Sequence, residues 1–333
     1  MKAQGYNIRW AGMMSVLFLA VHLTACGITT NWTKLDTATE SPAAETATPA
    51  PSEVPQERTL TDGMGHEVTI PAEPKRIIAS YLEDYLSALD VTPVAQWSVP
   101  NGMQYYLEKK LGGIPPIAYD LPYEAVLGFK PDLLIIGDEK EVEGDKYKLF
   151  SQVAPTFVLG AQINADWRLA LLKVGEVVGK TELAEQVLDD YETKAAVAKS
   201  TLHEKLPGQS AAAIWLMDGK FYIVSDKVSA GAVLYKDLSL SIPSLVQQIA
   251  AVSTVNWNVV SLEKLAQLDA DHIFLINSDS GSGSEALRDP LWRSIPAVKN
   301  GRLYVFGPET SWLYTGPIAN SQMIDDVMAS LVE

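Results

Sequence analysis

The sequence predicts an α/β protein with two similar lobes joined by a long helix. Three observations lead to this prediction. Short apolar runs alternate with longer amphipathic runs, a pattern typical of α/β folds with largely parallel strands. A pattern in the first half of the chain recurs in the second half. Between the two halves, helical periodicity extends over residues 164–206.

The candidate strands are short, apolar and mostly bounded by turn residues. They are 76–79, 93–96, 133–137, 156–159, 211–216, 221–224, 272–277 and 303–306.

The internal repeat supports two lobes with the same order of elements. Residues 123–136 read YEAVLGFKPDLLII, and residues 262–275 read LEKLAQLDADHIFL. At an offset of 139 residues, Glu124 aligns with Glu263 and Asp132 with Asp271. Each copy consists of a helical turn with a Glu near its start, then an Asp, and then an apolar strand. Apolar residues at i and i+3 place one helix face inward and leave the Glu exposed at the helix start. We therefore expect lobes at 58–163 and 207–333.

The connector between the lobes is expected to be helical over 164–206. Residues 164–178 are amphipathic, and Thr181 is placed to cap a second helix that extends to about Leu206. A helix of roughly 25 residues at ~1.5 Å per residue is about 38 Å long, which is enough to span both lobes. Pro207 and Gly208 end it.

The N-terminus predicts export. Lys2 and Arg9 precede a mostly apolar run over residues 11–23, which is shorter than the ~20 apolar residues of a membrane span. We assign residues 1–25 to a signal peptide. The letters LTAC that end at Cys26 resemble the lipobox of bacterial lipoproteins, in which the Cys carries the lipid; an ordinary signal peptide with an accidental Cys is the alternative. Residues 26–57, rich in Thr, Ala, Pro, Glu and Ser, are predicted to be a flexible linker. The expected location is extracytoplasmic, with Cys26 anchoring the protein to the cell membrane.

Composition and motifs disfavour several classes of function. The net charge is −15, and −17 without residues 1–25, which opposes binding to nucleic acid. His66, His203 and His272 are scattered, so no metal site is expected. No Gly-x-Ser-x-Gly, Walker or Gly-x-Gly-x-x-Gly motif is present. We predict a protein that is not an enzyme and holds no cofactor. A secreted α/β hydrolase is the rival reading from another class, but no nucleophile, base and oxyanion donors can be assembled for it.

Six segments, taken together and in order, resemble a known family. They are PKRIIASYLEDYLSALDVTPVA at 74–95, FKPDLLIIG at 129–137, GEVVGKTELAEQVLDDYETK at 175–194, SLEKLAQLDADHIFL at 261–275, DPLWRSIPAVKNGRLYVF at 289–306 and TSWLYTG at 310–316. The segments follow a lipobox, and their order resembles that in the substrate-binding proteins of bacterial ABC importers for iron siderophores, vitamin B12 and haem. The resemblance is strongest to the binders of ferric hydroxamates. The resemblance covers residues 58–333. It implies two Rossmann-like lobes joined by a single long α-helix, with the ligand in a cleft between them. We expect a monomer.

The expected ligand contacts follow the C-terminal ends of the strands, where ligands meet two-lobed α/β proteins. The candidates are Tyr81, Trp97, Trp215, Met217, Asn277, Trp312 and Tyr314. Trp215 and the Trp312–Tyr314 step match aromatic positions of the hydroxamate binders, whereas Met217 stands where some members carry Arg or Ser. Plain core packing is the alternative for the aromatic residues, and Asn277 and Asp138 are also placed to cap a turn. Three other tryptophans, Trp167, Trp257 and Trp292, are assigned to packing.

The charge near these positions predicts the type of ligand. Lys220 and Lys227 lie near the expected loops, without an Arg cluster. A ferric tris-catecholate carries three negative charges, whose burial requires several cationic partners. A ferric tris-hydroxamate is neutral or singly positive and suits aromatic faces with a few donors. We therefore expect a ferric hydroxamate siderophore, with haem or a corrinoid such as vitamin B12 as the alternative. The chelator holds the iron, so no protein ligand to the metal is expected.

Glu124 and Glu263 are predicted to dock on the permease. The resemblance implies that one Glu on each lobe binds the permease subunits of the importer. The simpler reading is that the helix dipole favours an acid there by a few tenths of a kcal/mol.

Overall fold

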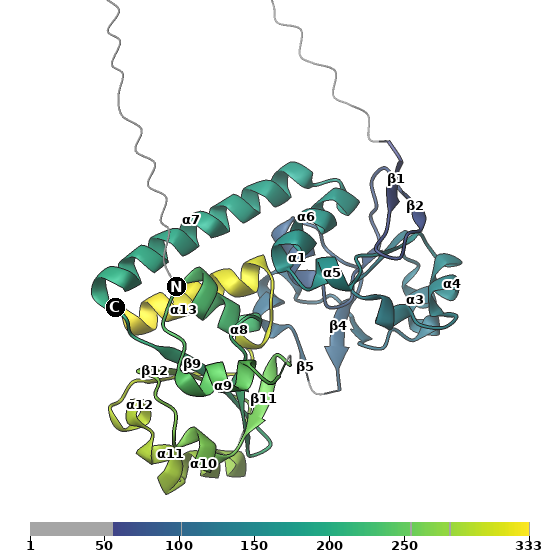
Figure 1. Cartoon of the computed structure of the whole chain (residues 1–333). Coiled ribbons are helices and arrows are strands. Elements are labelled where there is room, and N and C mark those ends of the chain that lie inside the picture. Colours follow the sequence, from purple (N-terminus) through teal and green to yellow (C-terminus); the bar gives the residue numbers. More distant parts are fainter. Residues whose placement is uncertain (1–55, 101, 254, 280, 333) are drawn as a thin grey trace, which may run out of the picture. The chain divides into compact units, whose positions relative to one another are not determined.

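The computed structural model describes residues 56–332 apart from 101, 254 and 280 (Figure 1). The predicted signal peptide, Cys26 and nearly all of the predicted linker lie outside the described residues. The predictions for them stay predictions.

The first lobe has an antiparallel hairpin followed by two small sheets. Its strands are β1 (Arg58–Thr61), β2 (Glu67–Ile70), β3 (Ile77–Ile78), β4 (Gln96–Val99), β5 (Gly102–Met103), β6 (Pro116–Ala118), β7 (Leu133–Ile136) and β8 (Thr156–Val158). One sheet is parallel with the order β3-β7-β8, and the other has the order β5-β4-β6. In the second sheet, β4 is parallel to β6 and antiparallel to β5.

Short helices connect these strands. They are α1 (Glu83–Ala88), η1 (Tyr105–Leu107), α2 (Glu108–Leu111), α3 (Tyr123–Phe129), η2 (Glu139–Val142) and α4 (Lys146–Ser151).

The second lobe is built on one five-stranded sheet. Its strands are β9 (Ala211–Met217), β10 (Lys220–Val224), β11 (Trp257–Val260), β12 (His272–Asn277) and β13 (Leu303–Phe306). The order is β11-β10-β9-β12-β13, with β9, β12 and β13 parallel and β10 antiparallel to both neighbours. Because β12 lies inside a parallel region covered on both faces, it reads as the unbroken apolar run IFLI.

The helices of this lobe all follow strand β10. They are α8 (Ser229–Gly231), the π-helical η3 (Ala232–Asp237), α9 (Ser244–Ala250), α10 (Leu262–Leu265), η4 (Gly281–Arg288), α11 (Pro290–Ser294), α12 (Pro296–Lys299), η5 (Ser311–Leu313) and α13 (Pro317–Leu331).

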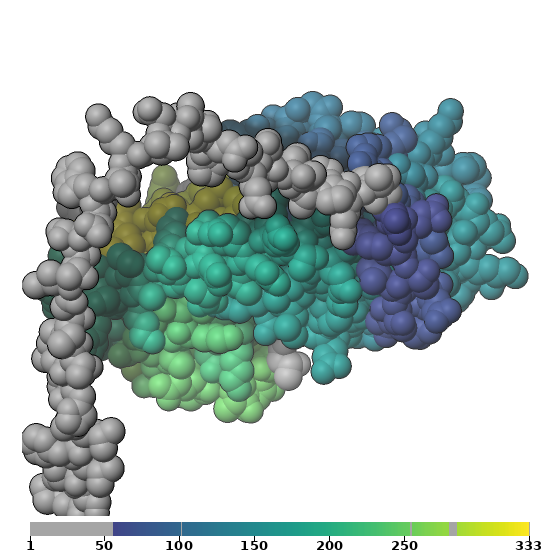
Figure 2. Space-filling model, turned by 90° about the horizontal axis from the view of Figure 1, so that it is seen from above, coloured from purple at the N-terminus to yellow at the C-terminus, as the bar shows by residue number. Residues whose placement is uncertain are grey.

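Between the lobes, the chain forms α5 (Ala161–Asn164), α6 (Trp167–Val178) and α7 (Thr181–Lys205). The long helix α7 has 25 residues and packs against α6 and α13 (Figure 1). One stripe of α7 is buried, formed by Ala184, Tyr191, Ala195, Ala198 and Leu202 at helical spacing. Its other face is polar, and Figure 2 views it from above. The predicted α/β fold with a single long helix between two lobes is confirmed.

One local prediction about the connector is wrong. Thr181 is the first helical residue of α7, and the N-cap is Lys180, which makes no side-chain capping bond. The helix predicted over 164–178 is α6, which ends at Val178 as expected and begins three residues late, at Trp167. The later start occurs because the Asp166 carboxylate accepts a hydrogen bond from the Arg168 backbone N–H at 2.9 Å and caps the helix there.

The internal repeat is present in the structure. Tyr123 begins α3 and Leu262 begins α10, 139 positions later. The same separation relates Leu133, which begins β7, to His272, which begins β12. The boundaries of the lobes at 163/164 and 206/207 remain predictions, because the packing of α6 and α13 is shared by both lobes.

Candidate ligand-binding cleft

A cavity of about 1020 Å³ lies between the two lobes. The first lobe contributes loops after β3 and the β4–β5 hairpin, and the second contributes the ends of β9 and β11 and the η5 region. Among its lining residues are Tyr81, Trp97, Met103, Tyr105, Trp167, Arg168, Trp215, Met217, Lys227, Lys236, Trp257, Ser278, Tyr314 and Asn320. Five of the seven predicted contact residues line it, namely Tyr81, Trp97, Trp215, Met217 and Tyr314.

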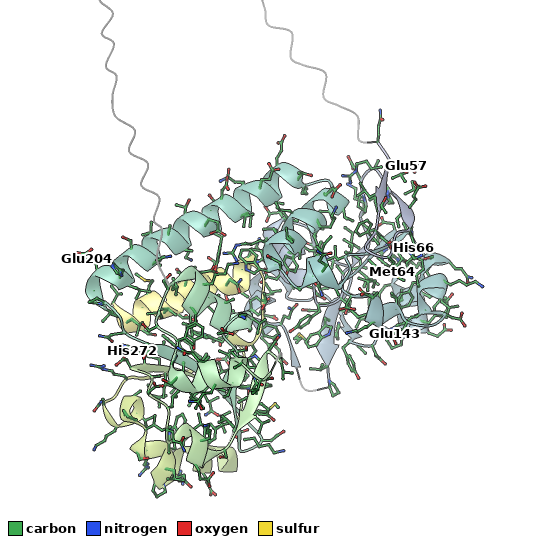
Figure 3. The ribbon with its side chains drawn as sticks, in the orientation of Figure 1. Glu57, Met64, His66, Glu143, Glu204 and His272 are labelled. Carbon is green, nitrogen blue, oxygen red and sulfur yellow. The ribbon has the colours of Figure 1, made fainter. Side chains whose placement is uncertain are left out.

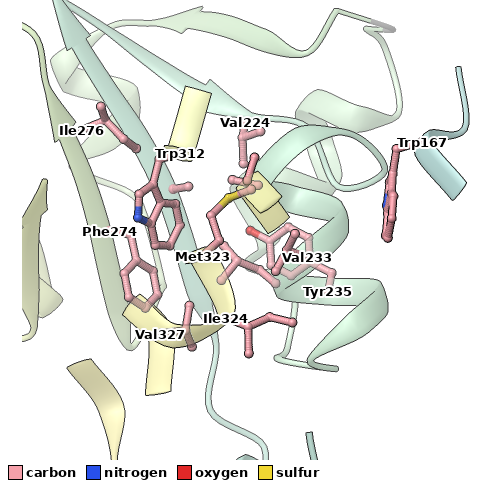
Figure 4. Packing of buried hydrophobic residues seen from close by; sticks show 14 of the residues in the cluster. Trp167, Val224, Val233, Tyr235, Phe274, Ile276, Trp312, Met323, Ile324 and Val327 are labelled. Carbon is pink, nitrogen blue, oxygen red and sulfur yellow. The ribbon is translucent and has the colours of Figure 1, made fainter. Parts of the chain in front are cut away.

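The prediction for Trp312 is wrong. Trp312 is fully buried and stacks on Phe274 with ring centroids 4.9 Å apart (Figure 4). Its Nε1 donates to the Asp326 carboxylate at 2.8 Å. Because η5 turns Trp312 inward and Tyr314 outward, only Tyr314 reaches the cavity. Trp312 therefore belongs to the core of the second lobe.

Asn277 also does not line the cavity. Its Oδ1 accepts a hydrogen bond from the Asp279 backbone N–H at 3.0 Å, so it holds the turn after β12. The neighbouring Ser278 reaches the cavity instead. In the first lobe, Asp138 has the corresponding task, since it forms a capping box at the start of η2.

Tyr81 and Trp97 of the first lobe, together with Tyr314 of the second, form one aromatic side of the cavity. The Tyr81 ring lies 4.8 Å from that of Trp97 and 6.3 Å from that of Tyr314, measured between centroids. Tyr81 has φ 62°, a left-handed conformation that is unfavourable for a large side chain and is typically kept at functional sites. Tyr314 comes from the second lobe, and its hydroxyl donates to the Met103 carbonyl at 3.0 Å. This hydrogen bond therefore joins the lobes across one side of the cavity.

A second aromatic pair forms the opposite side. The Trp215 and Trp257 rings are 6.0 Å apart and nearly perpendicular, and the Trp215 Nε1 donates to the Ser278 hydroxyl at 2.8 Å. Trp215 is thus oriented by a hydrogen bond within the lobe. Trp257, which the sequence assigned to packing, is a lining residue that the sequence reasoning missed. It begins the edge strand β11, and four residues are too few for periodicity to show which face it occupies.

The charge of the cavity is nearly balanced. Arg168 lies in the cavity wall. The sequence did not indicate this cation as a cleft residue, because helical periodicity alone does not place a residue of the connector on either lobe. The Arg168 guanidinium is held by the carboxylates of Glu192 and Asp237, at 2.5 and 2.8 Å. Exposed Lys227 and Lys236 line the rim, as do the acids Asp166 and Asp218. Lys220 is not among the lining residues.

Two buried polar atoms in the wall have no hydrogen-bond partner among the described residues. They are the Nε1 of Trp167 and the Oδ1 of Asn320, in side chains 6% and 2% exposed. Buried polar groups are otherwise nearly always paired. One donor and one acceptor in the wall are therefore unpaired, and both atoms are buried beneath the cavity surface. Trp167, for which the sequence predicts a packing role, is both packed and part of the cavity wall.

Two buried acids lie under the first-lobe side. Glu83 accepts a hydrogen bond from the Trp97 backbone N–H at 2.6 Å, and burial raises its pKa to about 8. Burial likewise raises the pKa of Asp84 to about 6, although three hydrogen bonds to its carboxylate oppose the rise. Both acids are buried behind the residues that line the cavity, and neither is a lining residue.

Within the described part of the chain, no group of three or more His, Cys, Asp and Glu side chains is placed to hold a metal ion. His66 pairs with Asp62 in the first lobe, and His272 lies between Gln209 and Tyr304 in the second (Figure 3). None of the described helices combines the length and apolar character needed to cross a membrane.

Glu124 and Glu263 occupy equivalent positions. Each is the second residue of its helix, α3 or α10, and each is exposed. The helix-start hydrogen bonds, from its own backbone N–H and the Ser261 side chain, lower the pKa of Glu263. Both carboxylates are therefore available to a partner protein.

The chain is similar to several known binding proteins. The family described as periplasmic binding protein matches residues 82–310. The iron-uptake system-binding protein of Bacillus subtilis (strain 168) is 28% identical over 300 residues, which cover 87% of this chain and 88% of that protein. The iron(3+)-hydroxamate-binding protein FhuD of the same organism is 27% identical over 333 residues, which cover 98% and 99%.

The fold has a close counterpart among solved structures. A FhuD fold-family protein of Bacillus subtilis, described as the binding component of a Fep/Fec-like ferrichrome ABC transporter, has a TM-score of 0.70 at 23% identity. The match covers 82% of this chain and all of that one. It supports the two-lobed architecture.

Proposed function

The chain belongs to the periplasmic binding protein family, and we propose that it captures a ferric siderophore outside the cytoplasm and delivers it to the permease of an ABC importer. The observation that carries this proposal is the cavity of about 1020 Å³ between the lobes, with aromatic walls on both sides. Such a cavity can surround a metal chelate and cover its apolar surface. The names of the relatives, an iron-uptake system-binding protein and an iron(3+)-hydroxamate-binding protein, support the same cargo.

Hydroxamate is the proposed chelating group. Arg168 is neutralised by Glu192 and Asp237, and the rim lysines are balanced by Asp166 and Asp218. A complex with three negative charges would therefore be buried without matching cations, which costs several kcal/mol. A neutral or singly positive hydroxamate complex avoids this cost.

The role of the protein is binding, with no chemical step and no cofactor of its own. The proposed iron ligands come from the siderophore. The Cys26 lipid anchor belongs to the same proposal, since a tethered binding protein stays close to its permease. Replacing Cys26 by Ala should release the protein from the membrane fraction of cells, and unchanged retention would contradict the anchor.

The function is tested by titrating residues 58–333 with ferric complexes while following tryptophan fluorescence. The panel contains a ferric tris-hydroxamate, a ferric tris-catecholate, haem and a corrinoid. The hydroxamate should saturate the protein at the lowest concentration. Tighter binding of the catecholate would contradict the charge argument, and binding of haem or the corrinoid alone would replace the siderophore as cargo.

Aromatic substitutions locate the site. Trp215→Ala should weaken hydroxamate binding by at least roughly thirtyfold, because a central aromatic anchor typically contributes ~2 kcal/mol or more. Trp292→Phe is the matched control, since Trp292 is buried against Phe221 away from the cavity. Equal affinity in wild type and Trp215→Ala would place the ligand elsewhere.

A further inference from the structure

A second cavity, of about 660 Å³, adjoins the cleft at the β4–β5 hairpin. Four residues line both cavities, namely Val99, Gly102, Met103 and Tyr105. The remaining lining residues are Ser98, Pro100, Pro116, Ala118 and Tyr119. We call this second cavity the hairpin slot. The hairpin therefore forms one border of the main cleft and of the slot.

Strand pairing explains the shape of the slot. Ser98 of β4 is paired in register with Ala118 of the parallel strand β6, so their small side chains lie on the same face of the sheet. Tyr105 and Tyr119 are 44% and 58% exposed. Small residues on the sheet with large aromatic residues beside them leave a hollow, and two tyrosine rings are available to cover what enters it.

The slot is apolar. None of its described lining residues is charged. The hydroxyl of Ser98 is already used, since it donates to the Ile117 carbonyl at 3.0 Å. A cluster of exposed aromatic, proline and aliphatic side chains that adjoins a binding cavity is typical of a recognition surface.

We propose that the hairpin slot binds an apolar arm of the same ligand whose iron-bearing head occupies the cleft. The ligand class is then a ferric siderophore that carries an apolar arm larger than acetyl, such as an aryl group or a longer acyl chain. This inference rests on the proposed function. It is favoured over an independent second ligand because the two cavities share a border of four residues, so one molecule can cross from the cleft into the slot.

The test compares three ferric complexes of one linear tris-hydroxamate with a terminal amine: the free amine, its N-acetyl derivative and its N-benzoyl derivative. Acetylation removes the positive charge without adding a ring, so the benzoyl-to-acetyl ratio of Kd isolates the arm. Burial of roughly 55 Å² of the ring should make the benzoyl complex bind about tenfold tighter than the acetyl complex. Tryptophan fluorescence of residues 58–333 gives each Kd.

Two variants localise the effect. Tyr119→Ala removes a ring that lines only the slot, and Ala118→Leu fills the slot from the exposed face of β6. Each should abolish the advantage of the benzoyl complex while leaving the acetyl complex within about twofold of wild type. Leu127→Ala, another exposed apolar side chain that lines neither cavity, is the control and should keep the tenfold advantage.

The outcomes separate the two proposals. If the acetyl complex binds and the benzoyl complex gains nothing, or if the gain survives in both slot variants, the slot is not a ligand subsite. If none of the three complexes binds, the proposed function fails, and the slot inference fails with it.

Discussion

Asp84 and Tyr106 are joined by a hydrogen bond of 2.9 Å in the interior, where the tyrosine hydroxyl donates to the carboxylate. The same carboxylate accepts the backbone N–H groups of Ile318 and Ala319 at 2.9 Å each, so Asp84 of α1 satisfies the start of α13. Gly316, which precedes α13, packs so closely on Asp84 that a β-carbon there would collide with the carboxylate. This contact ties the first lobe to the final helix beside Tyr314.

We expect Asp84→Ala to lower the free energy of unfolding by roughly 2–5 kcal/mol, because two backbone N–H groups and one hydroxyl lose their partner in a buried place. Urea unfolding at pH 7 measures the loss. Asp325→Ala is the matched control on α13, since Asp325 is exposed and pairs with Lys194 at the surface. That variant should lose less than about 1 kcal/mol. Equal losses in the two variants would show that the buried hydrogen bonds of Asp84 do not stabilise the fold.

Glu83 should make stability depend on pH. Burial, with a smaller contribution from the nearby Glu141 carboxylate, raises the pKa of Glu83 from an ordinary value of 4.5 to about 8 in the folded protein. Between these two values the folded protein keeps a proton that the unfolded chain releases. The contribution of Glu83 is therefore full below pH 4.5, falls as the pH rises to about 8, and is constant above it.

Glu83→Gln removes this dependence, because Gln stays neutral and its carbonyl can still accept the Trp97 N–H. The excess stability of the variant over wild type should be small at pH 5 and reach a few kcal/mol at pH 8.5. Denaturant unfolding at several pH values gives the difference curve. A difference that stays flat from pH 5 to pH 8.5 would mean that Glu83 titrates as an ordinary surface acid.

Trp312 should act on stability and not on the ligand. Removing a fully buried Trp typically costs about 3–5 kcal/mol, and Trp312→Ala also leaves the Asp326 carboxylate without its donor. Thermal unfolding should detect the loss, while the Kd for a ferric hydroxamate in the folded protein stays within about threefold of wild type. A variant with wild-type stability and strongly weakened binding would show that Trp312 contacts the ligand in the cleft.

The repeat shows how far the sequence specified the fold. Asp132 accepts hydrogen bonds from the backbone N–H groups of Lys75 and Arg76, directly before β3. Asp271 accepts the Ser210 backbone N–H, directly before β9. The same Asp thus holds the start of the neighbouring strand in both lobes. Pattern and periodicity predicted these elements because their signals are local and occur twice.

The contents of the cleft were harder to predict, because they depend on direction and long-range pairing. Trp312 and Tyr314 are two residues apart, yet the turn at η5 buries one and opens the other. Arg168 was missed as a cleft residue, and its neutralisation depends on Asp237, 69 positions away. The edge strand β11 and the pairing of β4 with β6 carry too few residues for periodicity, so Trp257 and the hairpin slot were visible only in the folded chain.

The two exposed acids of the repeat give the last prediction. Glu124 and Glu263 are the second residues of equivalent helices on the two lobes and line neither cavity. Single replacements by Ala should leave the Kd for a ferric hydroxamate within about twofold, because an exposed charge outside the cleft acts on a partner and not on the ligand. Fluorescence titration of the purified variants checks this part.

Uptake of radiolabelled iron by cells that carry each variant tests the docking role. The rate should fall in both single variants and fall most in the double variant, because each lobe then loses its charge toward the permease. Glu108→Ala is the control, since Glu108 is also an exposed acid at a helix start, on α2, but has no counterpart in the repeat. Uptake at the wild-type rate in the double variant would contradict the docking role and leave the helix dipole as the explanation for these acids. A large loss of ligand affinity in either single variant would show that this acid contacts the ligand.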